Sequence, residues 1–112
     1  MTKVTFLLQG DKILSVDIFD HAGYAEEGRD IVCAAISSAA MLTTVLLEDI
    51  QGIPIAKEED EPEARIRIEL PAEGVERGQE AMLALRYYFR VLEKEYYPEL
   101  INVMEVQADA ED

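Results

Sequence analysis

The chain has 112 residues, of which 49% are apolar, and its formal net charge is −14 at pH 7. This length predicts one domain with a modest hydrophobic core. The negative charge argues against nucleic-acid binding through phosphate contacts, because such binding relies on basic patches. The charge is consistent either with simple solubility or with attraction of a basic partner.

The chain has one cysteine, Cys33, and one histidine, His21. One cysteine excludes an intramolecular disulfide, which fits a reducing, cytoplasmic environment. A zinc site built from a cysteine cluster is also excluded, because the chain has only one cysteine and one histidine. We expect no metal and no cofactor. The chain begins without a signal-peptide pattern, and its longest apolar stretch, 34–47, is predicted to be too short and too polar to span a bilayer. We therefore expect no membrane contact.

Apolar and β-branched side chains predict two strands at the start of the chain, over residues 4–9 and 13–19. The Gly10-Asp11 pair between them is typical of a two-residue hairpin turn, so the two strands should pair antiparallel. The second strand alternates apolar and polar side chains, as expected of a strand with one buried face.

A long helix is predicted from Asp30, a residue type typical of an N-cap, to about residue 48 or 50. The face expected to pack against the core carries Ile31, Ala35, Ser38, Leu42, Val45 and Leu46. A different face carries small side chains, and a groove or a close-packed neighbour is expected against it; its residues are Cys33, Ser37, Ala40 and Thr44.

The second half of the chain contains a clear alternating strand and a clear amphipathic helix. The predicted segments are an exposed acidic loop over about 56–63, a strand over 64–70, a helix over 78–97, a strand over 101–106 and a mobile acidic tail over about 108–112. The apolar stripe of the helix consists of Met82, Leu85, Phe89, Leu92 and Tyr96.

The element order β-β-α-β-α-β predicts a single α+β domain over residues 1–112. We expect a two-layer sandwich, in which a four-stranded, largely antiparallel sheet is covered by two helices on one face. Periodicity does not determine the order of the remaining strands.

The segment around His21 and Cys33 contains the candidate catalytic residues. His21 follows a predicted strand, and Cys33 falls in the first turn of the predicted helix. Unpaired N–H groups and the helix dipole at this end favour a thiolate, and the same amides suit an oxyanion. A histidine that reaches the sulfur would accept its proton and later return it to a leaving amine. The pattern indicates a nucleophilic thiol.

Each of these residues also has a purely structural interpretation. A free cysteine is commonly a small buried hydrophobe, and a lone histidine is commonly polar surface. Asp30 either caps the helix only or also orients His21 as a third catalytic member. Ser37, one turn after Cys33, either hydrogen-bonds near the site or simply eases helix packing.

The same segment resembles the signature of the ribosomal-processing cysteine protease family, Prp. The resemblance is carried by His21-Ala22, followed by Gly28-Arg29-Asp30-Ile31-Val32-Cys33-Ala34-Ala35-Ile36-Ser37. The family pattern reads Gly-His-Ala, a short variable loop, Gly-x-Asp-Ile-Val-Cys-Ala, and a serine four residues after the cysteine. Here Asp20 stands in place of the first glycine, where its charge should favour the imidazolium form of His21.

The resemblance implies a bacterial, cytoplasmic and dimeric protease with a mixed two-layer fold. Such proteases remove a short N-terminal extension from large-subunit ribosomal protein twenty-seven, which ribosome assembly requires. Carried over by position, His21 is the base and Cys33 the nucleophile. Asp30 is the supporting acid, Ser37 lines the site, and Gly28 belongs to a mobile loop over it.

The primary functional prediction is therefore a cysteine endopeptidase acting on a basic ribosomal protein precursor. Two alternatives remain open from the residues alone. One is a non-catalytic acidic module that binds or escorts a basic ribosomal protein. The other is a redox-sensing thiol protein, against which the lack of a second, resolving cysteine in the chain counts.

Overall fold

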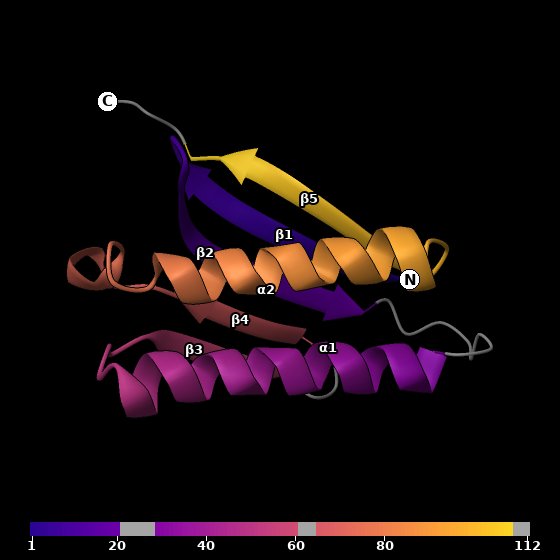
Figure 1. The fold of residues 1–112 in the computed structure, drawn as a ribbon, viewed down its shortest axis with the longest axis horizontal. Coiled ribbons are helices and arrows are strands. Elements are labelled where there is room, and N and C mark those ends of the chain that lie inside the picture. The colour runs from indigo at the N-terminus through magenta and orange to yellow at the C-terminus, as the bar shows by residue number, and fades with distance from the viewer. Residues whose placement is uncertain (21–28, 61–64, 109–112) are drawn as a thin grey trace.

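The computed structural model describes residues 1–20, 29–60 and 65–108, apart from the side chains of Arg29 and Asp30. Two predicted site residues, His21 and Gly28, and most of the predicted acidic tail lie outside this part. The elements in chain order are β1 (Thr2–Gln9), β2 (Lys12–Asp20), α1 (Arg29–Thr44), η1 (Val45–Ile50), β3 (Ala56–Asp60), β4 (Arg65–Glu69), η2 (Ala72–Gly74), α2 (Gln79–Val91), η3 (Leu92–Tyr96) and β5 (Ile101–Gln107) (Figure 1).

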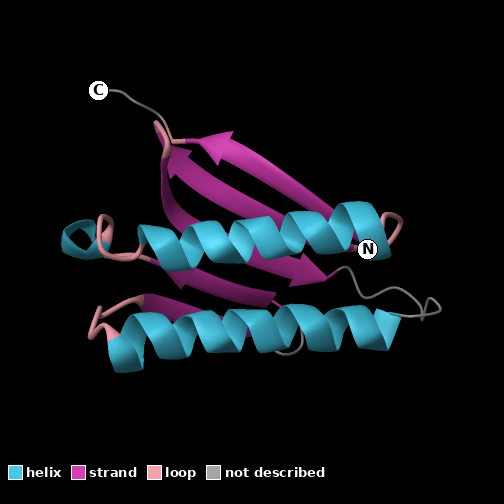
Figure 2. Ribbon diagram, viewed as in Figure 1, coloured by secondary structure: helices cyan, strands magenta, loops and turns pink. Residues whose placement is uncertain are grey.

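The strands form one mixed sheet in the order β3-β4-β2-β1-β5. β1 and β2 pair antiparallel across the predicted two-residue turn, where Gly10 has a φ of 63° that favours glycine. β5 pairs parallel with β1, and the other neighbours pair antiparallel. Both long helices lie on the same face of the sheet, which confirms the predicted two-layer α+β arrangement (Figure 2).

Within the described residues the sheet has five strands, so the predicted four-stranded sheet is wrong, and the predicted acidic loop over 56–63 is wrong for residues 56–60, while residues 61–63 lie outside the described part. The missing strand is β3, whose five residues, Ala-Lys-Glu-Glu-Asp, are all exposed. It has no buried apolar side chain that would reveal a strand pattern. Its register with β4 places Glu58 opposite Arg67 and Asp60 opposite Arg65, and opposite charges across strands are stabilising.

The core lies between the helices and one face of the sheet. The inward side chains of β1, including Val4 and Phe6, meet the buried stripe of α2. The rings of Phe6 and Phe89 lie 6.4 Å apart between centroids, a distance typical of stabilising aromatic pairs. The predicted stripe of the second helix is thus confirmed at Met82, Leu85, Phe89 and Leu92, whereas Tyr96 is exposed.

Helix α1 differs from its prediction in start and orientation. It begins at Arg29, so Asp30 lies within the helix and is not its N-cap, and Cys33 is about one turn from the start. The predicted packed face is wrong, since Ile31 and Leu42 are 62% and 71% exposed. Nearly every side of this helix carries apolar residues, so periodicity could not select the inward one. The buried residues of α1 and η1 are Val32, Ile36, Ala40, Thr43, Thr44 and Leu47.

By length and composition, the stretch Ile31–Ile50 is long and apolar enough to cross a membrane, with a mean hydropathy of 1.9. The prediction that this region is too short and too polar was therefore wrong on those two criteria. In the fold, 33% of the stretch is buried, and residues such as Val32 and Ile36 pack in the core.

Candidate active site

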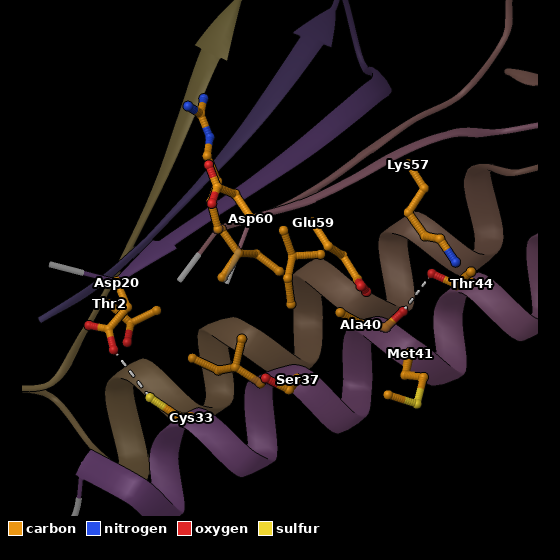
Figure 3. A pocket seen from close by; sticks show the side chains of 14 residues that line it. Thr2, Asp20, Cys33, Ser37, Ala40, Met41, Thr44, Lys57, Glu59 and Asp60 are labelled. Atoms are coloured by element: carbon orange, nitrogen blue, oxygen red, sulfur yellow. Dashed lines mark hydrogen bonds between the residues drawn. The ribbon is translucent and has the colours of Figure 1, made fainter. Parts of the chain in front are cut away.

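A pocket of about 490 Å³ lies between α1 and the part of the sheet formed by β2, β4 and β3 (Figure 3). It is lined by Thr2, Ile18, Asp20, Cys33, Ile36, Ser37, Ala40, Met41, Thr44, Lys57, Glu59, Asp60, Arg65 and Ile66. Apolar side chains from the core side, such as Ile18 and Ile36, form part of this lining. Carboxyl groups come from β2 and β3, and cationic groups come from β3 and β4. The pocket therefore offers both apolar and charged contacts to a ligand.

The small-residue face of α1 borders this pocket, as the sequence predicted. Cys33, Ser37, Ala40 and Thr44 all contribute to the lining. Because these side chains are short, they do not fill the space between the helix and the sheet. Thr43 and Thr44 turn their hydroxyl groups back to carbonyl oxygens four residues earlier, at 2.8 Å and 3.0 Å.

Cys33 is a half-buried cysteine that forms no disulfide within the chain, and it lies at the end of this pocket nearest the start of α1. Because Cys33 is only half-buried, it is not the fully buried core residue that the structural interpretation expected. Because helix dipoles place partial positive charge near the N-terminus, this end of α1 is favourable for a thiolate. Ser37 lies one turn further along the same side of the helix.

Asp20 is a hydrogen-bond partner of Cys33. The Cys33 thiol donates a hydrogen bond to Oδ2 of Asp20, with a sulfur–oxygen distance of 3.2 Å (Figure 3). Asp20 is the last residue of β2, pairs in register with Thr2 of β1, and is only 6% exposed. The sequence pattern indicated Asp20 only as a neighbour of His21. The signal for its true position was the strand alternation, since Val16 and Ile18 on the same face point into the core.

Four further charged residues of the pocket come from elements far from Cys33 in sequence, and no motif in the sequence indicated them. Lys57, Glu59 and Asp60 belong to β3, and Arg65 begins β4. Arg65 is bound by the carboxylate of Asp17, at 3.0 Å and 2.7 Å. This hydrogen bond and charge raise the pKa of Arg65 above its ordinary value, so the guanidinium stays charged. Because Arg65 is already paired with Asp17, the carboxyl groups of the described lining outnumber its remaining cationic group, that of Lys57.

The structure brings together two of the five predicted site residues. Cys33 and Ser37 line one pocket. Asp30 lies in the first turn of α1, but its side chain is outside the described part of the chain, as are His21 and Gly28. Over residues 1–20, 29–60 and 65–108, no three His, Cys, Asp or Glu side chains are arranged to hold a metal ion.

Solved structures share this fold. SMU.848 from Streptococcus mutans is 28% identical, with a TM-score of 0.83 and 96% of each chain covered. The essential ribosomal processing protease Prp from S. aureus, in complex with a substrate peptide, is 20% identical, with a TM-score of 0.85 over 94% of this chain and 99% of that chain. The same S. aureus protease with a covalently linked product peptide is 21% identical, with a TM-score of 0.80 and the same coverage. No curated protein matches the chain.

The family comparison extends over nearly the whole chain. The family model described as cysteine protease Prp matches residues 1–102, which include every described strand and helix except most of β5. A thiol at a pocket beside a helix N-terminus is an arrangement that favours a cysteine nucleophile. The chain therefore belongs to the cysteine protease Prp family.

Proposed function

We propose that this protease removes the N-terminal extension of the precursor of large-subunit ribosomal protein twenty-seven, and thereby supports ribosome assembly. The observation that carries the proposal is the position of Cys33 on the pocket between α1 and the sheet, in a chain of the Prp family. Support for a ribosomal substrate comes from the S. aureus relative, which is named a ribosomal processing protease and was crystallised with a substrate peptide.

In the proposed reaction, Cys33 is the nucleophile and His21 is the base. His21 takes the thiol proton as sulfur attacks the carbonyl carbon of the scissile bond, and the proton then passes to the leaving amine. The resulting thioester at Cys33 is hydrolysed by water, which regenerates the thiol. Asp30 supports the base, Ser37 contacts the bound peptide, and Gly28 is a further supporting residue.

The acidic balance of the pocket supports a basic substrate. Glu59 and Asp60 border the pocket, and the whole chain carries a charge of −14. Long-range attraction between such a surface and a cationic ribosomal protein accelerates encounter. A non-catalytic module that escorts a basic protein would use the same attraction, but it would have no use for a thiol on the pocket.

We also propose that the protein is cytoplasmic and forms a homodimer, as the family resemblance implies. The single cysteine fits a reducing compartment. A second copy of the chain would cover apolar side chains that α1 and η1 expose to solvent, namely Ile31, Met41, Leu42, Val45, Leu46 and Ile50. Sedimentation at micromolar concentration tests this, and a monomer under those conditions contradicts it.

The test of the proposed function uses a synthetic peptide that spans the N-terminal extension and the first mature residues of the host's own ribosomal protein twenty-seven. The purified protein should cut this peptide at one bond, as detected by mass spectrometry, and should leave a scrambled peptide of equal charge intact. Binding of both peptides without cleavage would contradict the proposal and favour the acidic binding module.

A further inference from the structure

The contact between Asp20 and Cys33 has a consequence for the reactivity of the thiol. The carboxyl group lies at the buried end of β2, and its Oδ2 accepts the hydrogen of the Cys33 thiol at 3.2 Å. Burial weakens the screening that water provides between two charges. Removal of the thiol proton would therefore place a thiolate against a carboxylate at short range.

Two like charges in one site disfavour each other, so a carboxylate beside a thiol opposes formation of the thiolate. The N-terminal end of α1 acts in the opposite direction, because its partial positive charge favours the thiolate. The two influences meet at the same sulfur atom. The side chain at position 20 and the N-terminal end of α1 therefore act on the same thiol in opposite directions.

We propose that Asp20 is a positioning residue that keeps the Cys33 thiol protonated and directed toward β2 in the free enzyme, and so sets the pH at which the nucleophile becomes reactive. The thiol proton must leave this contact before sulfur attacks a carbonyl. The inference concerns the thiol itself and does not depend on which ribosomal protein is cut.

Other charged groups around Cys33 contribute less directly. In the described part of the chain, Lys57, Glu59 and Asp60 of β3 and Arg65 of β4 share the pocket with Cys33, whereas Asp20 accepts the hydrogen bond of the thiol itself. Arg65 is held by Asp17. Removal of the Asp20 charge should therefore change the thiol more than removal of any of these others.

The experiment measures the rate at which iodoacetamide alkylates Cys33 in the intact protein between pH 5 and pH 10. Asp20→Asn keeps an oxygen acceptor but removes the charge. We expect its midpoint to lie at least about one pH unit lower than that of the wild type, which corresponds to roughly tenfold faster alkylation at pH 7. Asp20→Ser should shift the midpoint in the same direction and serves if the asparagine variant does not fold.

The matched control is Asp49→Asn, which removes one carboxylate from an exposed position in η1, outside the pocket residues. It should alkylate at the wild-type rate within twofold. Circular dichroism verifies that each variant is folded. This check is needed because an unfolded chain would be alkylated with the midpoint of free cysteine, about 8.5. An unchanged or higher midpoint in folded Asp20→Asn, or an equal shift in Asp49→Asn, would overturn the inference. Because no peptide is used, this outcome is independent of the substrate test above.

Discussion

Cys33 and Ser37 lie four residues apart on α1, and both side chains line the same pocket. The spacing places them on one side of the helix, one turn apart. This relationship places the proposed nucleophile on the surface that would hold the peptide.

Replacement of Cys33 by alanine should abolish cleavage of the precursor peptide, because no other thiol exists in the chain. Since Cys33 is only half-buried, the variant should stay folded, with a melting temperature close to that of the wild type. Mass spectrometry of the peptide and a thermal melt check the two statements. Cleavage at the wild-type rate by Cys33→Ala would remove Cys33 from the mechanism.

His21→Ala should lower kcat/KM by about 10²–10⁴-fold, which is the typical contribution of a general base. Binding of the peptide to the inactive variant should be nearly unchanged, since the base acts on the proton and does not hold the substrate. Stopped assays at several pH values provide the rate, and fluorescence anisotropy provides the affinity. A loss of affinity that accounts for the whole effect would assign His21 to binding instead.

Ser37→Ala should lower kcat/KM for the peptide by about three- to tenfold, which corresponds to the loss of one hydrogen bond to the substrate. The neighbouring Ser38→Ala is the matched control, because Ser38 is also exposed but is not part of the pocket lining. Equal rates for both variants would show that Ser37 serves only the packing of the helix.

Glu59→Gln should weaken the reaction with a cationic peptide by about two- to fivefold, mainly through KM, since exposed charge pairs contribute little more. It should also reduce the loss of rate that added salt causes, because salt screens the attraction that the variant lacks. Glu58→Gln changes the same charge one residue earlier on β3, outside the pocket lining, and should behave as the wild type. A wild-type rate that does not respond to salt would contradict this electrostatic contribution.

Gln79→Ala should reduce the free energy of unfolding by about 1–3 kcal/mol, because it leaves buried polar groups unpaired. Gln79 is 7% exposed, accepts the N–H of Ile13 at 2.8 Å and donates to the carbonyl of Ile13 at 2.8 Å. It thereby joins the start of α2 to the start of β2. Urea denaturation followed by circular dichroism measures the loss.

The control for this stability prediction is Gln51→Ala, whose side chain donates an exposed hydrogen bond to the carbonyl of Arg77. Water can replace that bond, so the variant should lose less than about 1 kcal/mol. Equal losses in the two glutamine variants would mean that the buried contact with Ile13 has no special role in stability.

Sequence-based predictions worked where one face of an element carried most of the apolar side chains. The alternation of Ile66 and Ile68 with arginines predicted β4, and the stripe through Met82 and Phe89 predicted α2. The sequence did not predict strand β3, because this strand has no apolar pattern. The buried face of α1 was predicted wrongly, because apolar residues lie on several sides of this helix. Its small-residue face was more informative than its apolar residues, because small side chains leave room for a pocket.

The amino-acid sequence alone determined the class of fold, the identity of the candidate nucleophile and the family resemblance, because local patterns and a short contiguous motif carry that information. Only the tertiary structure placed the carboxyl group of Asp20 on the Cys33 thiol and brought the charges of β3 to the pocket. Residues 20 and 33 meet because the end of β2 and the beginning of α1 pack together in the folded sandwich. Such contacts depend on strand order and on helix rotation, and neither property is encoded in the periodicity of a single segment.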